Sequence, residues 1–272
     1  MIKTKELLSI ITNISIKAGK EIMNIYNSDN FEIKLKNDNS PLTIADKNAH
    51  IIISEGLSKT GFPILSEEGK NISYEERKSW EYYWLVDPLD GTKEFIKRNG
   101  EFTVNIALIH NGTPILGVVY APFLKDLYIG SLELGSYKIE NINSSINTKD
   151  VIIDKFMSDT NKIPQDNKRK KYTIVGSRSH MNEDTEKFIE NLKEIHGEID
   201  FISKGSSLKL CMVAEGKADI YPRFAPTMEW DTGAGHAIAT GAGFIVTHKD
   251  GETPLKYNKE DLLNPWFIVK SK

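Results

Sequence analysis

A short apolar run that ends abruptly in acidic residues constrains this chain more than any other feature. Residues 82–86 read Tyr-Tyr-Trp-Leu-Val, and residues 87–92 follow at once with Asp-Pro-Leu-Asp-Gly-Thr. Aromatic and β-branched residues in so compact a run are typical of a buried strand. A glycine and a hydroxyl residue at the turn that follows leave backbone N–H groups able to hold a phosphate. We therefore expect a buried sheet with acidic side chains at the end of one strand.

Further periodicity predicts helices and strands on both sides of this run. Apolar residues recur at steps of three and four along residues 7–25, which predicts a long amphipathic helix. Residues 102–108 alternate between apolar and other side chains, and Asn-Gly at 111–112 leads into the apolar run 115–120. This pattern predicts a β-hairpin, and residues 126–131 are expected to add a third strand.

The second half of the chain alternates between predicted strands and helices. In its first helix, Phe188, Leu192 and Ile195 form the expected buried face. The expected strands lie at 172–176 and 218–221, and the expected helices at 182–195, 206–216 and 232–240.

A polar segment separates the two halves. Residues 141–171 are rich in Asn, Ser, Lys and Asp, which favours a surface loop or a junction, with one short strand expected at 151–153. We predict an N-terminal α+β subdomain at 1–145 and a C-terminal α/β subdomain at 146–272. Mixed elements of this kind predict layered sheets and helices, an α/β (α+β) class.

Composition excludes several classes of protein. The 272 residues include one cysteine, so neither an internal disulfide nor a thiolate zinc site is expected. The formal net charge of −3 gives no general attraction to nucleic acid. No stretch approaches the ~20 apolar residues of a membrane span, and the amphipathic N-terminus is unlike a signal peptide. We expect a cytoplasmic protein.

The acidic residues at strand and helix ends predict a metal site. Asp87 and Asp90 end one strand, Glu67 ends another, and Asp231 precedes a helix. Carboxylates brought together repel one another, so such a cluster needs a cation or raised pKa values. An all-oxygen set favours Mg²⁺ or Mn²⁺ over Zn²⁺, and no HxH or HExxH pair supports zinc. Two ions about 3.5–4 Å apart could activate water and stabilise a leaving oxygen.

Each acid also has a simpler interpretation. Glu67 could be a solvated turn residue, and Asp231 could cap the helix that follows it. A phosphatase of the haloacid-dehalogenase type also has an apolar strand before a DGT motif. That type needs two aspartates two residues apart, whereas Asp87 and Asp90 are three apart. The joint occurrence of the four acids favours the metal site.

Three blocks of the sequence resemble the inositol-monophosphatase superfamily. They are residues 67–68, residues 84–92, which include the Asp-Pro-Leu-Asp-Gly-Thr run, and residues 229–236, which read Glu-Trp-Asp-Thr-Gly-Ala-Gly-His. Residues 93–105 more narrowly resemble the bacterial 3′(2′),5′-bisphosphate nucleotidases of sulfate assimilation. The resemblance implies a layered αβαβα sandwich of the inositol-monophosphatase and fructose-1,6-bisphosphatase type. It also implies Mg²⁺-dependent hydrolysis of 3′-phosphoadenosine 5′-phosphate to AMP and phosphate, in nucleotide recycling during sulfur assimilation.

The resemblance also assigns roles at the metal site. Asp46, at the expected start of a second helix, pairs with Thr92 to activate water, and Glu67 is counted with these catalytic residues. For Asp46 alone, a helix-start residue is the simpler interpretation. The backbone of Gly91 and Thr92 is implied to hold the scissile phosphate. The implied metal ligands are Glu67, Asp87, Asp90, Asp231 and the carbonyl of Leu89. All of them except Asp87 are also implied to contact the substrate.

Four further residues match the nucleotide-binding pattern of the resemblance. Lys209 and Arg223 are expected near the 5′-phosphate or ribose, His180 near the base, and Ser206 as a hydrogen-bond donor. Isolated basic residues are more often solvated surface groups. Two residues outside this set have structural interpretations: Cys211 is expected in a core, and His236 is expected to be structural.

The remaining implications of the resemblance concern cofactors, partners and alternatives. Two or three Mg²⁺ ions per active site are implied, with Mn²⁺ as a substitute and inhibition by lithium. The protein is expected to be a monomer or homodimer in the cytoplasm, with peripheral association with the inner membrane as an alternative. The alternative functions are an inositol monophosphatase or other sugar-phosphate phosphatase of the same fold, and a non-catalytic nucleotide-binding regulator.

Overall fold

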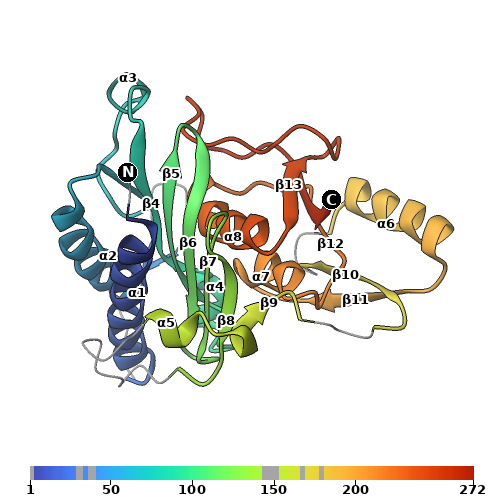
Figure 1. The fold of residues 1–272 in the computed structure, drawn as a ribbon, viewed down its shortest axis with the longest axis horizontal. Helices are drawn as coiled ribbons and strands as arrows, with labels where there is room; N and C mark the ends of the chain where they lie inside the picture. Colours follow the sequence, from blue (N-terminus) through green and yellow to red (C-terminus); the bar gives the residue numbers. More distant parts are fainter. Residues whose placement is uncertain (1–2, 29–32, 36–40, 143–152, 166–168, 178–180) are drawn as a thin grey trace.

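Five alternating layers of helix and sheet make up the fold (Figure 1). The computed structural model describes residues 3–28, 33–35, 41–142, 153–165, 169–177 and 181–272. Helices α1 and α2 cover one face of the larger sheet, and α7 and α8 lie between the two sheets. Helix α6 covers the outer face of the smaller sheet. The predicted αβαβα sandwich is therefore confirmed.

The larger sheet contains seven described strands in the order β3-β4-β5-β6-β7-β8-β9. Strands β3 and β4 are parallel, and every later neighbouring pair is antiparallel. The strands are β3 (Ile64–Ser66), β4 (Tyr82–Asp90), β5 (Thr103–His110), β6 (Thr113–Ala121), β7 (Asp126–Ser131), β8 (Gly135–Ile139) and β9 (Lys162–Ile163).

Strand β4 is buried on both faces, which explains its continuous apolar run. Trp84 and Val86 pack in the core beneath α1 and α2, whereas Leu85 packs on the opposite side against the middle helices. The predicted strand at 82–86 is confirmed and continues to Asp90. Its pairing with β5 is irregular between Asp87 and Asp90, so the acidic end of the strand departs from regular alternation.

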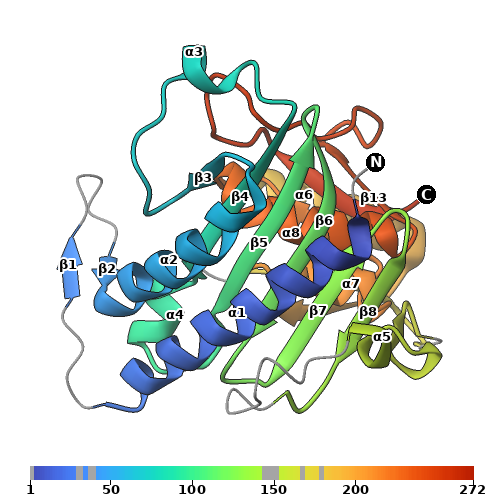
Figure 2. The same cartoon turned by 60° about the vertical axis from the view of Figure 1, so that its left-hand side comes forward.

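The predicted first helix and hairpin are also confirmed. Helix α1 (Thr4–Tyr26) buries one apolar face, and α2 (Ile44–Leu57) packs beside it (Figure 2). Asn111 and Gly112 connect β5 to β6 with φ values of 47° and 70°. Positive φ at both turn residues matches the twist of a tight hairpin, which is why the Asn-Gly pair predicts it.

The smaller sheet contains five described strands in the order β11-β10-β12-β14-β13. The first three are parallel to one another, and β14 is antiparallel to both of its neighbours. The strands are β10 (Tyr172–Gly176), β11 (Ile199–Ser203), β12 (Ile220–Arg223), β13 (Phe244–His248) and β14 (Phe267–Ser271).

Helix α6 (Glu183–His196) corrects one detail of the sequence analysis. Leu192 is buried and Phe188 is partly buried, but the prediction that Ile195 is buried was wrong, because its exposed fraction is 72%. The last buried residue of the helix is Leu192, and His196 is exposed although its ring stacks on Tyr172 with centroids 3.8 Å apart. Ile195 therefore lies beyond the part of the helix that is buried against the sheet.

Part of the polar segment 141–171, which connects the strands of the two sheets in the sequence, belongs to the larger sheet. Strand β9 pairs with β8, and α5 (Ile153–Phe156) contacts α1. Of the strand expected at 151–153, the first two residues lie outside the described residues, and Ile153 begins α5. The subdomain division at 145/146 stays a prediction. The remaining short elements are β1 (Ile33–Leu35), β2 (Pro41–Thr43), η1 (Ser58–Thr60), α3 (Tyr74–Arg77), α4 (Thr92–Ile96) and η3 (Asp159–Asn161).

The two central helices are α7 (Leu208–Ala214) and α8 (Glu229–Gly241). Helix α8 packs against the larger sheet at very short range, because glycine and alanine line its contact face. A methyl group on Gly117 of β6 would lie 2.3 Å from the carbonyl oxygen of Ala234. None of the described helices has the length and apolar character needed to cross a membrane.

We predict that Gly117→Ala lowers the free energy of unfolding by about 1–3 kcal/mol, because the added methyl group must displace the α8 backbone. Chemical denaturation of both proteins measures this difference. Thr113→Ala, an exposed position on the same strand, is the control and is expected to change stability by less than about 0.5 kcal/mol. Equal stability of Gly117→Ala and the parent protein would contradict the close packing described here.

Candidate active site

Three aspartates from two layers of the fold place their carboxylates together. Asp87 and Asp90 lie at the end of β4, and Asp231 lies in the first turn of α8. One oxygen from each carboxylate lies within 4.8 Å of the others. The structure thus brings together three of the four acids that the sequence analysis grouped as metal ligands.

Glu67, the fourth acid, lies beside this cluster. It directly follows β3, and its backbone N–H donates to the carbonyl oxygen of Val86 at 3.1 Å. Because β3 and β4 are parallel, their ends meet at the same edge of the sheet. The Glu67 side chain lies close enough to Asp87 for its negative charge to raise the pKa of that aspartate. Three of the four acids therefore lie at the same end of β3 and β4, and Asp231 of α8 lies close to two of them.

Burial and crowding of negative charge strongly perturb this cluster. Burial, followed by the negative charges of Glu67, Asp90 and Asp231, raises the pKa of Asp87 well above its usual value. Burial, followed by the charge of Asp90, likewise raises the pKa of Asp231. A divalent cation among these oxygens would relieve both effects. The all-carboxylate donor set fits a hard cation, consistent with the expected cofactor.

Asp46 makes the contacts expected from both interpretations that the sequence analysis gave for it. It lies in the first turn of α2, where its Oδ2 accepts hydrogen bonds from the Thr43 backbone N–H at 2.7 Å and the Thr43 hydroxyl at 2.5 Å. Its Oδ1 accepts a hydrogen bond from the Thr92 hydroxyl at 3.2 Å. Burial raises the pKa of Asp46. The same carboxylate therefore begins a helix and pairs with the threonine of the DGT turn.

The turn from β4 into α4 requires a glycine. Gly91 has φ of +91°, in the left-handed region, and a Cβ there would lie 3.1 Å from the carbonyl oxygen of Glu101. Thr92 begins α4, and its hydroxyl also lies 3.4 Å from the carbonyl oxygen of Leu89. The predicted strand-to-helix turn is therefore present beside the carboxylates.

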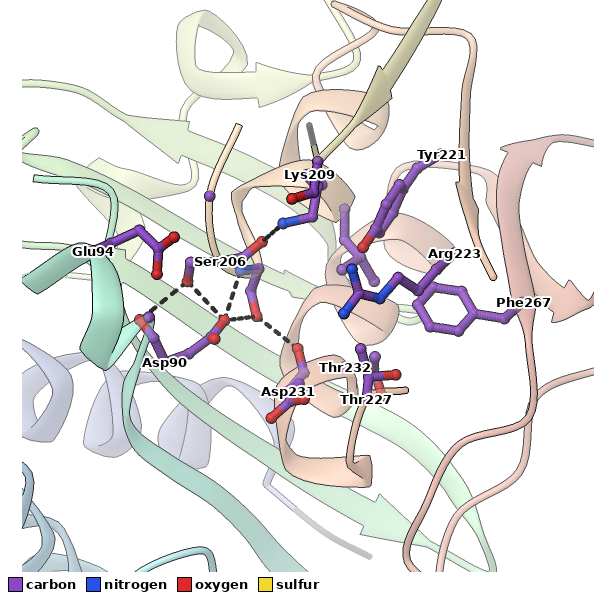
Figure 3. A pocket seen from close by; sticks show the side chains of 15 residues that line it. Asp90, Glu94, Ser206, Lys209, Tyr221, Arg223, Thr227, Asp231, Thr232 and Phe267 are labelled. Atoms are coloured by element: carbon purple, nitrogen blue, oxygen red, sulfur yellow. Dashed lines mark hydrogen bonds between the residues drawn. The ribbon is translucent and has the colours of Figure 1, made fainter. Parts of the chain in front are cut away.

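A cavity of about 120 Å³ opens next to the cluster (Figure 3). Asp90 and Asp231 lie on one side of it, and Lys209, Tyr221 and Arg223 lie on the other. The carboxylate of Glu94 also lines the cavity. The described charged side chains at this cavity are thus three carboxylates and two cations, a formal charge of −1. A phosphorylated ligand needs added positive charge to enter.

Lys209 is an unusual lysine because its ammonium group is buried. Its Nζ donates to the carbonyl oxygens of Ser206 at 2.6 Å and Lys204 at 3.3 Å. Burial lowers the pKa of Lys209 to about 8, although the charge of Asp90 partly opposes this shift. The predicted substrate lysine is therefore held inside the cavity wall, not on the solvated surface.

Arg223, at the end of β12, borders the same cavity. Its Nη2 donates to the carbonyl oxygen of Pro226 at 2.9 Å, whereas its buried Nε has no hydrogen-bond partner among the described residues. His180, the fourth nucleotide residue expected from the sequence, lies outside the described residues.

Ser206 lies in the loop before α7 and donates a hydrogen bond from its hydroxyl to Oδ2 of Asp90 at 2.6 Å. The sequence analysis missed its neighbour Ser207 and also Asn105, which contact the same carboxylate. One signal for Asn105 was available, because it is the one polar residue in the otherwise apolar run 104–109. Nothing local distinguishes Ser207 from its neighbour.

Cys211 and His236 lie in structural positions, as expected. Cys211 is fully buried in α7, within the core between the two sheets. The Nδ1 atom of His236 lies 3.0 Å from the Tyr257 hydroxyl, and burial lowers the pKa of this histidine to about 3. Neither residue lines the cavity beside the carboxylates.

Comparisons with known proteins show the family of this chain. The model of the inositol monophosphatase family matches residues 3–271. The 3′(2′),5′-bisphosphate nucleotidase CysQ of Salmonella typhimurium is 44% identical over 267 residues, which is 97% of this chain and 99% of that protein. The same enzyme of Escherichia coli K12 is 44% identical over 268 residues, again with coverage of 97% and 99%.

Solved structures give the same result for the fold. The crystal structure of CysQ from Bacteroides thetaiotaomicron superposes with a TM-score of 0.91, at 49% identity over 100% of this chain and 99% of that one. The inositol monophosphatase from Anabaena superposes with a TM-score of 0.71, at 24% identity over 99% and 92%. The second likeness concerns the fold alone.

We predict that Asp87→Asn stabilises the metal-free protein at pH 8. The pKa of Asp87 in the folded state is raised above its unfolded-state value of about 3.9. Burying this side chain therefore costs least below the unfolded-state pKa, where it is protonated in both states. The free energy of unfolding falls as the pH rises through the folded-state pKa, because the buried carboxyl group must then carry a charge. Asparagine keeps the oxygen that accepts the Leu89 N–H and removes the charge. Denaturation in EDTA is expected to show a higher unfolding free energy for the variant at pH 8, with the gap closing toward pH 4.

Added Mg²⁺ is expected to reverse this order, because only the parent protein keeps the full ligand set and gains binding free energy. Asp250→Asn is the control of opposite sign. Hydrogen bonds from Thr253 and the backbone lower the pKa of Asp250 to about 2, so losing this charge brings no stabilisation. Lower stability of Asp87→Asn than of the parent protein in EDTA at pH 8 would contradict the repulsion argued here.

Proposed function

This chain belongs to the inositol monophosphatase family, and on that premise we propose that it is a 3′(2′),5′-bisphosphate nucleotidase. It is a phosphoric monoester hydrolase that removes the 3′-phosphate from 3′-phosphoadenosine 5′-phosphate and releases AMP and phosphate. Relatives with 44% identity over 97% of this chain carry that name. The observation that carries the proposal is a single cavity bordered by the carboxylate cluster on one side and by two cationic side chains on the other.

A divalent cation, which we propose to be Mg²⁺, binds at the carboxylate cluster. Glu67, Asp87, Asp90, Asp231 and the Leu89 carbonyl are the proposed ligands of two or three ions, and Mn²⁺ is a proposed substitute. When bound, the cations supply electrostatic stabilisation of the transferring phosphoryl group and make the attacking water more acidic. The raised pKa values of Asp87 and Asp231 support this assignment, because buried carboxylates at this density need positive charge.

Asp46 and Thr92 are the proposed proton acceptors for the attacking water. The Thr92 hydroxyl donates to Asp46 Oδ1, so its own oxygen is oriented to accept a proton from water. The proton of Thr92 passes to Asp46 in the same event. Asp46 remains fixed meanwhile, because its other oxygen is held by the backbone and hydroxyl of Thr43. Gly91 and Thr92 would hold the scissile phosphate through their backbone.

The opposite side of the cavity suits the second phosphate. Lys209 and Arg223 supply two positive charges there. We propose that these side chains bind the 5′-phosphate, that Ser206 donates a hydrogen bond to the substrate, and that His180 lies near the base. A cytoplasmic location, inhibition by lithium and a monomeric or dimeric state complete the proposal.

A substrate panel tests the proposed function. We expect the purified protein with Mg²⁺ to hydrolyse 3′-phosphoadenosine 5′-phosphate with a kcat/KM at least about tenfold above that for inositol 1-phosphate or fructose 1,6-bisphosphate, a difference of about 1.4 kcal/mol in transition-state binding. Phosphate release measures all three reactions. Equal or faster hydrolysis of inositol 1-phosphate would contradict the nucleotide assignment, and no release from any substrate would contradict the hydrolase itself.

We predict that Lys209→Met raises the KM for 3′-phosphoadenosine 5′-phosphate about 10- to 100-fold, the usual loss for a charged hydrogen bond. Because 3′-AMP lacks the 5′-phosphate, its hydrolysis is expected to change little. The parent protein should lose kcat/KM for the bisphosphate above about pH 8, where Lys209 becomes neutral. Lys187→Met, at an exposed lysine, is the control. An equal loss with both substrates would show that Lys209 does not bind the 5′-phosphate.

A further inference from the structure

Asp90 is held through only one of its two carboxylate oxygens. Its Oδ2 accepts hydrogen bonds from the Ser206 hydroxyl at 2.6 Å and the Ser207 backbone N–H at 2.6 Å, and the Ser207 hydroxyl lies 2.7 Å away. The amide of Asn105 approaches the same oxygen at 3.4 Å. No described donor approaches Oδ1 within hydrogen-bonding distance. The four contacts fix the orientation of the carboxylate and leave Oδ1 for another ligand.

Ser207 also connects Asp90 to the other half of the cluster. Its hydroxyl oxygen lies 2.6 Å from the carbonyl oxygen of Asp231 and accepts a hydrogen bond from the Asn105 amide at 2.9 Å. The hydroxyl carries a single proton, which it can donate either to the Asp90 carboxylate or to the Asp231 carbonyl. Ser207 is 2% exposed and Asn105 is 1% exposed, so water does not compete for these contacts. Two proposed metal ligands from different layers therefore share one hydroxyl group.

The orientation of Asn105 is itself fixed by a neighbour. The Thr103 hydroxyl donates to Oδ1 of Asn105 at 2.9 Å. The Ser206 hydroxyl lies 2.7 Å from Thr103, and its single proton can be donated either to the Thr103 oxygen or to Asp90. With the Asn105 oxygen occupied in this way, the amide must direct its N–H₂ group toward Ser207 and Asp90. The network thus runs from β5 through the loop before α7 to the end of β4.

Ser206 adopts a backbone conformation that serines rarely adopt. Its φ is +54°, in the left-handed region that a glycine occupies without strain. Glycine at this position would lose the hydroxyl that donates to Asp90. Strained conformations of this kind are found where the surrounding structure requires them, commonly at functional sites.

We propose that Ser207 and Asn105 are positioning residues of the metal site. They hold Asp90 by Oδ2, which would leave Oδ1 available to a divalent cation, and they fix the spacing between Asp90 and the start of α8. Partners of this kind are known to orient ligating carboxylates and to tune metal affinity. The inference rests on the proposed metal ligands. It differs from a purely structural role for this buried network, which would affect stability but leave cation affinity unchanged.

Cation binding by the metal-free protein tests the proposal. The free Mn²⁺ signal in electron paramagnetic resonance gives the Kd for the parent protein, Ser207→Ala and Asn105→Ala. We expect each variant to bind Mn²⁺ about 10- to 100-fold more weakly, the usual effect of losing such a partner. The double variant should be weakened by less than the product of the single effects, because both act through the Ser207 hydroxyl. The Mg²⁺ concentration for half-maximal activity should rise in parallel, with kcat at saturating Mg²⁺ changed little.

Ser136→Ala is the matched control. Ser136 is fully buried, and its hydroxyl donates to the carbonyl oxygen of Ile238, outside the cluster. This variant should lose stability in EDTA and keep the parent Kd. Unchanged Mn²⁺ affinity in Ser207→Ala and Asn105→Ala, or an equal loss in Ser136→Ala, would overturn the proposal. If Ser207→Ala does not fold, Asn105→Ala decides. Absence of Mn²⁺ binding by the parent protein would instead overturn the proposed metal site.

Discussion

Mutual repulsion among buried carboxylates is the constraint on which the rest of this structure depends. Asp87, Asp90 and Asp231 approach one another within 4.8 Å, and Glu67 adds a fourth charge beside them. Such an arrangement is unfavourable in the absence of a cation. It persists because the acids belong to a rigid strand of the larger sheet, the turn after its parallel neighbour and the first turn of a central helix. The fold therefore maintains a negative site that a divalent cation can neutralise.

Backbone N–H groups hold each of the three aspartates in place. These donors orient one oxygen of each carboxylate through main-chain groups that every substitution except proline retains, so the arrangement does not depend on side chains alone. The side-chain donors of the loop before α7 then add to the backbone contact at Asp90 alone. The three pairs are Leu89 N–H with Asp87, Ser207 N–H with Asp90, and Met228 N–H with Asp231, at 3.0, 2.6 and 2.9 Å.

Sequence patterns predicted the parts of the molecule whose signals are local. The buried run of β4, the Asn-Gly hairpin and the amphipathic face of α1 are each encoded in neighbouring residues, so all three were predicted. Ile195 was misplaced because the buried part of α6 ends at Leu192, before the last turn of the helix. How far a helix extends beyond the sheet that covers it depends on the tertiary structure, which helix periodicity does not describe.

The positioning residues were missed for a related reason. Ser207 and Asn105 are 102 positions apart, and neither is adjacent to an acidic residue in the sequence. Their role arises only where the loop before α7 meets β5. The four acids were grouped in advance because strand ends and the resemblance both pointed to them, whereas a buried serine or asparagine has no such signature. Contacts between layers, rather than local propensity, define this part of the site.

The loop before α7 links the two ends of the cavity. Ser206 accepts a hydrogen bond from Lys209 through its carbonyl oxygen and donates one to Asp90 through its hydroxyl. Glu101 anchors the same loop, accepting hydrogen bonds from the Gly205 N–H at 2.7 Å and from the Lys204 Nζ at 3.0 Å. A substrate with two phosphates at a fixed separation requires a fixed distance between its cationic and metal-binding contacts. Because one anchored loop holds both, this separation is part of the fold and does not depend on the substrate for its formation.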